Sequence, residues 1–318
     1  MIFIAEFCQN HNGDFELLKD MVYAAKESGA DYAKIQTIFA YMLSYRERFE
    51  EGIEKNGEVI TIKRPYQAEY DRLKGLEISM EQQAEFVQLC NKVGIKPLTT
   101  AFTRDSVKAI KEVGFNQIKL ASYDCASPTL LREVKDTFEK IFVSTGATFD
   151  NEIEQAAAIL KDADFSLLHC VTMYPTPLDE FHLARMKYLR KYSESVGWSD
   201  HSLIARDGIL GTLASVFYGA DIIERHFTIL PSEQTKDGPV SVRPEHVIEL
   251  KSFSRLSKVQ MNEYLEDKFP TYQITWGIAE RLLSEAELRN RDYFRGRFAN
   301  KLTNGETVFN WEEKEIEL

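Results

Sequence analysis

The chain has 318 residues, 44% of them hydrophobic, which is enough for a core domain of about 250 residues with an appendage. Its 50 acidic residues outnumber 39 basic ones, for a net charge of −11, and no run of Lys or Arg offers the basic face of a nucleic-acid-binding protein. No apolar run approaches the ~18 residues of a membrane span, and the first residues carry no signal pattern, so we expect no membrane partner and a cytoplasmic location.

Short apolar runs alternate with longer segments of helical period. The runs cover residues 1–7, 32–36, 96–102, 117–122, 140–146, 165–171, 195–200 and 220–227. Between them, segments such as FELLKDMVYAAKESGA place apolar residues at i, i+3, i+4 and i+7. Because the runs are continuously apolar, they predict parallel strands buried on both faces, and eight β/α units predict an α/β fold of the (β/α)8 TIM barrel type. The alternative, an open doubly wound sheet, fits less well because G-x-G-x-x-G is absent after the first run.

Two regions depart from this repeat. Residues 40–79 are long for a β/α connection and rich in aromatic and basic residues, which indicates a solvated excursion, a lid or a subunit contact over the catalytic face. Residues 258–318 follow the barrel domain, which we place at 1–257. They are helical in pattern to about 293 and then read as a short β-like tail with a hairpin turn at TNGE.

Lysines interrupt two of the apolar runs. Lys34 and Lys119 would lie among buried residues, where an ammonium needs a counter-charge. The active site of a (β/α)8 barrel lies at the carboxyl ends of its strands, where hydroxyl side chains also gather. These are Thr100, Ser122, Ser144 and Ser199. Together they predict a cradle for a phosphate or carboxylate, which would supply the missing charge.

Two histidines end neighbouring strands of the predicted barrel. His201 follows VGWSD and His226 ends DIIERH, and either could simply be a packing residue. Barrel closure would bring Glu6 of the first strand into the same sector. Two imidazoles beside a carboxylate suit Mn, Fe, Co or Zn, so we interpret the pair as metal ligands. The four cysteines (Cys8, Cys90, Cys125 and Cys170) form no C-x-x-C pair and are expected to be buried free thiols.

Several motifs together resemble the sialic acid synthase family, which makes nonulosonic acids. They run in the family's order from IAEFCQNHNGDFELLKDMVYAAKESGADYAKIQT through IKLAS, STGAT, LLHCVTMYPTP, VGWSDHS and IERHFT to KDGPVSVRPEH, over about residues 2–255. The resemblance implies a (β/α)8 barrel followed by an antifreeze-like domain, a homodimer, and condensation of phosphoenolpyruvate with an open-chain N-acylated hexose. The sugar would be N-acetylmannosamine or a 2,4-diacetamido-6-deoxyhexose.

The resemblance also implies residue roles. His201 and His226 match metal ligands, usually for manganese, and Glu6 and Asp237 match acidic catalytic positions. Phosphoenolpyruvate contacts are matched by Lys34, Thr100, Lys119, Ser122, Ser144 and Ser199, and by Thr172 where relatives often have Asn or Ser. Gln36 and Tyr174 match residues near the sugar.

The tail resembles only the opening of the antifreeze-like domain. In the family, that domain reaches over a partner's barrel and offers an Arg to the sugar. Arg295, Arg297 or the 40–79 region would have to replace it. The tail is rich in aromatics, so we expect it to be docked, on its own barrel or, as the resemblance favours, on a partner.

Two other functions remain open from the sequence. A Schiff-base aldolase or another lyase of the same fold would use Lys34 or Lys119 as a nucleophile. A non-catalytic sugar-binding barrel would need none of the acidic or histidine side chains.

Overall fold

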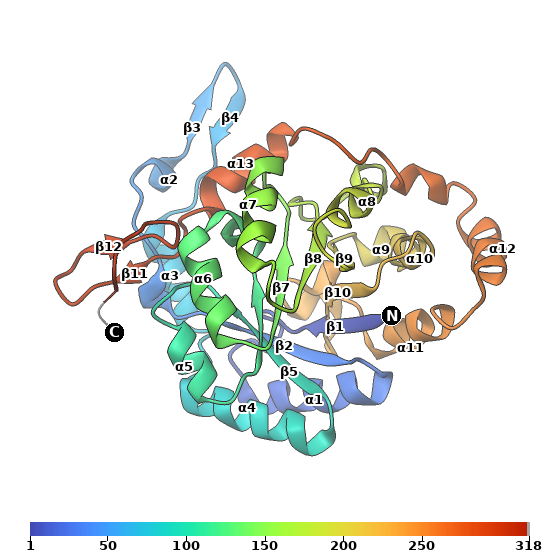
Figure 1. Ribbon diagram of the computed structural model, residues 1–318, viewed down its shortest axis with the longest axis horizontal. Coiled ribbons are helices and arrows are strands. Elements are labelled where there is room, and N and C mark those ends of the chain that lie inside the picture. Colours follow the sequence, from blue (N-terminus) through green and yellow to red (C-terminus); the bar gives the residue numbers. More distant parts are fainter. Residues whose placement is uncertain (317–318) are drawn as a thin grey trace.

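The computed structural model, which describes residues 1–316, places eight parallel strands in a closed barrel surrounded by helices (Figure 1). The barrel strands are β1 (Ile2–Glu6), β2 (Tyr32–Thr37), β5 (Lys96–Ala101), β6 (Gln117–Leu120), β7 (Lys140–Ser144), β8 (Phe165–Cys170), β9 (Ser195–Asp200) and β10 (Ile222–His226). Their order is β1-β10-β9-β8-β7-β6-β5-β2, closed by pairing of β1 with β2. All eight predicted strands and the predicted (β/α)8 barrel are confirmed, and the open sheet is excluded.

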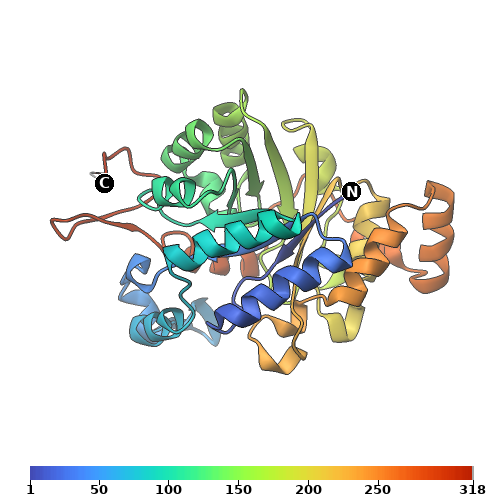
Figure 2. The same ribbon diagram turned by 90° about the horizontal axis from the view of Figure 1, so that it is seen from below.

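Helices cover the outside of the barrel. They are α1 (Phe15–Ser28), α4 (Met80–Val93), α5 (Val107–Glu112), α6 (Pro128–Thr137), α7 (Asp150–Leu160), α8 (Arg185–Leu189), α9 (Ile204–Asp207), α10 (Leu210–Phe217) and α11 (Pro244–Phe253). The first begins where the Asp14 carboxylate accepts hydrogen bonds from two backbone amides, and it ends at Gly29 with φ of 92°. Figure 2 shows α1 and α4 side by side along the barrel wall.

The inside of the barrel is layered because side chains alternate along each strand. An apolar layer fills the interior, made of Ile4, Tyr32, Leu98, Phe142, Leu168 and Ile222. Two positions further along the same six strands stand Glu6, Lys34, Thr100, Ser144, Cys170 and Glu224, all buried. The same inner face therefore carries a closed apolar floor and, above it, a layer of polar and charged groups at the carboxyl ends.

The region 40–79 folds into η1 (Ala40–Met42), α2 (Arg48–Glu51), the hairpin β3 (Ile53–Lys55) and β4 (Glu58–Thr61), and α3 (Tyr66–Lys74). The hairpin projects from the body (Figure 1). The segment before it, which contains α2, packs against the C-terminal extension, residues 258–318. Phe49 meets Tyr293 with ring centroids 5.1 Å apart, and Arg48 pairs with Asp292 at 2.5 Å. The region is thus tied to residues far along the chain and is more than a solvated excursion.

The extension comprises α12 (Lys258–Lys268), η6 (Tyr272–Thr275), α13 (Glu285–Phe294), β11 (Asn300–Lys301) and β12 (Thr307–Val308). The last two strands pair in antiparallel fashion around Gly305, whose φ of 84° suits the predicted hairpin turn. None of the described helices combines the length and apolar character needed to cross a membrane.

The tail docks on the barrel of its own chain. The Asn310 amide donates to the Phe102 carbonyl at 2.8 Å and to Asp124 at 2.9 Å, and Arg104 donates to the Lys314 carbonyl at 2.8 Å. Docking was expected, but this is the alternative that the resemblance did not favour. The likeness to an antifreeze-like domain stays a prediction.

Candidate active site

A cavity of about 510 Å³ opens at the carboxyl end of the barrel. Three parts of the chain line it: strand ends and their loops, the 40–79 region, and the extension. The side chains that matter below are Cys8, Gln36, Tyr174, His226 and Asp237 from the barrel, Arg64, Glu69 and Arg72 from the region, and Phe294 and Arg297 from the extension.

The two predicted lysines lie close together, bridged by a carboxylate, although neither lines the cavity itself. Lys34 Nζ is 3.7 Å from one oxygen of Glu224, and Lys119 Nζ is 3.8 Å from the other. Lys34 also pairs closely with Glu6. Burial lowers the pKa of Lys34 to about 8, although the Glu224 charge opposes the shift. Glu6 and Glu224 thus supply counter-charges that we had expected from an external anion. Glu224 itself was not among the predicted site residues.

Two of the predicted hydroxyls contact this group of charges directly. Ser144 accepts a hydrogen bond from Lys119 at 2.5 Å, and Ser199 donates to Glu224 at 3.1 Å. Ser122 and Thr172 both face Gly146, since a Cβ there would lie 2.9 Å from the Ser122 hydroxyl and 2.7 Å from the Thr172 methyl. The buried Thr172 hydroxyl has no hydrogen-bond partner among the described residues. Thr100 is the register partner of both Lys119 and Gln36.

The two predicted metal ligands are neighbours, with ring centroids of His201 and His226 5.4 Å apart. Burial lowers the pKa of both imidazoles, that of His201 well below its ordinary value, so both are neutral, the form that binds metals. The carboxylate beside them is Asp237, whose Oδ2 lies 3.7 Å from His226 Nδ1. Glu6 lies in this sector as expected, since it is the register partner of His226, but its carboxylate engages Lys34 and the Cys8 amide.

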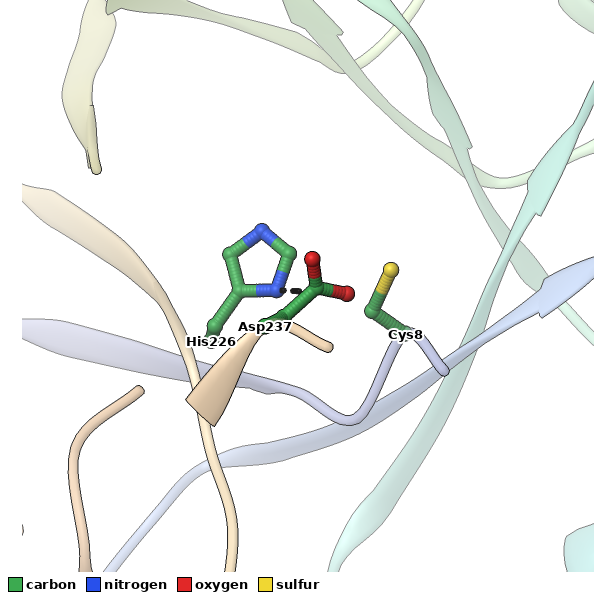
Figure 3. Close-up of side chains that lie close together, drawn as sticks. All are labelled: Cys8, His226 and Asp237. Atoms are coloured by element: carbon green, nitrogen blue, oxygen red, sulfur yellow. Dashed lines mark ion pairs between the residues drawn. The ribbon is translucent and has the colours of Figure 1, made fainter. Parts of the chain in front are cut away.

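Cys8 joins His226 and Asp237 in one cluster (Figure 3). One ligand atom from each lies within 4.8 Å of the other two. Nothing in the sequence separates this thiol from the three other buried cysteines, except that Cys8 follows Glu6 by two positions and so belongs to the same strand end. His201 is not part of this three-residue cluster.

A buried ion pair holds the two histidine-bearing strand ends together. Arg225, which precedes His226, donates to the Asp200 carboxylate at 3.2 Å, and Asp200 precedes His201. The guanidinium also donates to Thr212 Oγ1 and to the Ser202 carbonyl, each at 2.8 Å. This pair positions both imidazoles without facing the cavity, and sequence reasoning did not select it.

The outer wall of the cavity holds the residues predicted near the sugar. The ring centroids of Tyr174 and His201 lie 4.3 Å apart. The Gln36 amide donates to Glu6 at 3.4 Å. Opposite them Arg297 pairs with Glu69, which also accepts two 2.8 Å hydrogen bonds from Arg72. Arg295 is absent from the cavity lining and reaches Glu152 at 3.4 Å.

Comparison with known proteins points to one family. A profile of the NeuB family matches residues 21–264. The chain is 33% identical over 252 residues to the N,N'-diacetyllegionaminic acid synthase of Legionella pneumophila, covering 77% of this chain and 68% of that protein. The enzyme of the same name from Campylobacter jejuni is 28% identical over an alignment of 330 residues, covering 98% and 93%. The crystal structure of an N-acetylneuraminic acid synthetase from Leptospira borgpetersenii, in complex with citrate, superimposes with a TM-score of 0.68 at 28% identity, covering 92% of each chain.

Proposed function

The chain belongs to the NeuB family, and from that premise we propose that it condenses phosphoenolpyruvate with an N-acylated hexose to give a nonulosonic acid and phosphate. The observation that supports this most is the pair of buried lysines, bridged by Glu224 and contacted by Ser144 and Ser199, at the same strand ends as a cavity lined by His226 and Asp237. In this proposal the lysines suit a small anion, and the histidines and the carboxylate suit an aldehyde.

Phosphoenolpyruvate is proposed to bind at the layer of polar and charged groups that contains Lys34 and Lys119. Lys34 and Lys119 hold its phosphate and carboxylate, helped by the hydroxyls of Thr100, Ser122, Ser144, Thr172 and Ser199. Burial keeps water away and strengthens each of these contacts. The unpartnered Thr172 hydroxyl supports a ligand oxygen at that point.

The sugar is proposed to occupy the upper cavity, facing Gln36 and Tyr174. Asp237 and Glu6 are the proposed groups that move protons, to the new alkoxide and from the water that adds to the former enol carbon. His201 and His226 fit a divalent ion, Mn²⁺ by resemblance, which when bound would polarise the sugar aldehyde.

The outer cover of the sugar comes, in this proposal, from the same chain. Arg297 and Phe294 of the extension line the cavity opposite Tyr174, and Arg64 and Arg72 of the 40–79 region stand beside them. The expected homodimer stays a prediction, which light scattering of the purified protein checks.

Phosphate release tests the function. Purified protein with Mn²⁺ and phosphoenolpyruvate is offered N-acetylmannosamine and 2,4-diacetamido-6-deoxyhexoses, and products are identified by mass spectrometry. We expect phosphate and a nonulosonic acid with one of these sugars, and neither after chelation until Mn²⁺ is restored.

No phosphate from any of them would refute the proposal. Trapping of substrate on Lys34 by borohydride would favour the Schiff-base aldolase instead, which the lowered pKa of that amine makes the second candidate.

A further inference from the structure

Cys8 adopts a backbone conformation that side chains seldom take. Its φ is 45°, in the left-handed region, directly after β1. For a residue with a Cβ this conformation is strained, whereas Gly adopts it freely. The turn is held by the Cys8 amide, which donates to Glu6 at 2.7 Å, and the residue lines the cavity. Strained backbone of this kind clusters at functional sites, so the position indicates a functional role for the Cys8 thiol.

The thiol, imidazole and carboxylate of the cluster have the spacing of metal ligands. Their ligand atoms lie within 4.8 Å of one another, and the His226–Asp237 distance is 3.7 Å. Around a tetrahedral ion with bonds of about 2.0–2.3 Å, neighbouring ligand atoms are roughly 3.3–3.6 Å apart. The 3.7 Å between His226 and Asp237 is already close to this spacing.

A second, independent observation is that one ring nitrogen of His226 lacks a hydrogen-bond partner. Its Nδ1 is buried and has no hydrogen-bond partner among the described residues, although the Asp237 oxygen approaches it. Leaving such an atom unsatisfied is unfavourable, so buried polar atoms of this kind generally have a partner. A cation held between Nδ1, the carboxylate and the thiolate would give Nδ1 the partner that it lacks.

We propose that Cys8 is a direct thiolate ligand of the divalent ion, together with His226 and Asp237, with His201 beside the fourth position. A thiolate is a soft ligand, so the site prefers Zn²⁺, Fe²⁺ or Co²⁺ to Mn²⁺. The catalytic meaning of this ion rests on the proposed function, but the binding itself rests on the geometry of the cluster.

Cobalt reports the thiolate directly, because a sulfur-bound Co²⁺ absorbs through sulfur-to-metal charge transfer. Metal-free protein is titrated with Co²⁺ in the parent and in Cys8→Ser, Cys8→Gly and Cys170→Ser. The last is the matched control, a buried thiol 3.8 Å from His201 Nδ1 but outside the cluster. We expect the charge-transfer band in the parent and in Cys170→Ser, and none in either Cys8 variant. Loss of an outer-shell partner costs 10–100-fold in affinity, so Zn²⁺ affinity without Cys8 should fall by at least about 100-fold.

The outcomes separate this inference from the proposed function. Co²⁺ binding to the parent without the band, or a band retained in Cys8→Ser, overturns the thiolate ligand and leaves the synthase proposal standing. A Cys8-dependent band in a protein that releases no phosphate with any sugar supports the site and refutes the synthase. If Cys8→Ser does not fold, Cys8→Gly still decides, because glycine suits the positive φ.

Discussion

Replacing Asp200 with Asn should lower the free energy of unfolding by about 3–5 kcal/mol, because a buried guanidinium then loses its counter-charge. Arg225 is 1% exposed and Asp200 is 0% exposed. Burial lowers the pKa of Arg225, and the Asp200 carboxylate is the main group that opposes this shift. Without the negative charge, the full cost of desolvating the cation remains.

The size of the loss follows from what the substitution leaves in place. Asp200 accepts hydrogen bonds from the Ser202 amide at 2.7 Å, from Thr212 at 2.6 Å and from Arg225 at 3.2 Å. An Asn of the same shape keeps one acceptor oxygen but turns an amide group toward one of these donors. Most of the loss is therefore electrostatic and comes from the arginine.

A matched control carries the same chemical change on the surface. Asp221 pairs with Arg190 at 2.9 Å, with the two side chains 45% and 39% exposed. Exposed pairs of this kind contribute about 0–1 kcal/mol. The Val196 amide also donates to Asp221 at 3.0 Å, and the Asn oxygen can still accept that hydrogen bond, so Asp221→Asn should cost no more than this.

Urea unfolding, followed by tryptophan fluorescence, to which the buried Trp198 on β9 contributes, measures both variants. Equal losses of under about 1 kcal/mol would refute the reasoning, since they would mean that the buried pair is solvated or dispensable. A double variant, Asp200→Leu with Arg225→Met, should recover part of the loss, because it removes both buried charges.

Three kinetic predictions accompany this one. Lys119→Met should raise the Michaelis constant for phosphoenolpyruvate roughly 10- to 150-fold, because a hydrogen bond to a charged group contributes about 1.5–3 kcal/mol. The Michaelis constant for sugar should rise far less. Equal increases in the two constants would show that Lys119 is not part of the anion site. The pKa of Lys34 is lowered to about 8, so its positive charge is present below that pH and is lost above it. The Michaelis constant for phosphoenolpyruvate should therefore rise as the pH passes 8 in the parent but stay level in Lys34→Arg, and a level profile in the parent would contradict this. Arg297→Met should raise the Michaelis constant for sugar about tenfold or more. Arg295→Met alters a side chain outside the cavity and should leave this constant unchanged. A larger increase in Arg295→Met than in Arg297→Met would assign the sugar contact to Arg295.

The barrel could be predicted because burial on both faces leaves a plain mark in the sequence. The strands are mostly apolar, and the charged residues within them, such as Lys34 in β2 and Glu224 in β10, therefore stand out. Alternation then puts these interruptions on the inner face, above the apolar layer. The lysines were predicted for the same reason, since a charge inside an apolar run needs an explanation.

The contacts between distant segments could not be predicted. Nothing in the sequence says that Glu224 balances both lysines, because that depends on how the barrel closes. Cys8 reads as one more buried thiol until its backbone angle and the approach of Asp237 are known. The aromatic tail indicates burial but not its partner, and Asn310 finds Phe102 and Asp124 only through the fold.

Anion binding and stability are coupled in the charged layer, which affects how its variants must be read. Glu224 is buried, which acts to raise its pKa, yet attraction to Lys119 and Lys34 brings the pKa below its ordinary value. Removing Lys119 weakens the phosphoenolpyruvate contact and also strips this carboxylate of one of its two cations. The double variant Lys119→Met, Glu224→Gln removes the second effect and keeps the first. If the loss of phosphoenolpyruvate affinity persists in the double variant while the free energy of unfolding recovers, Lys119 contacts the anion directly. If both recover together, the lysine acts only through Glu224.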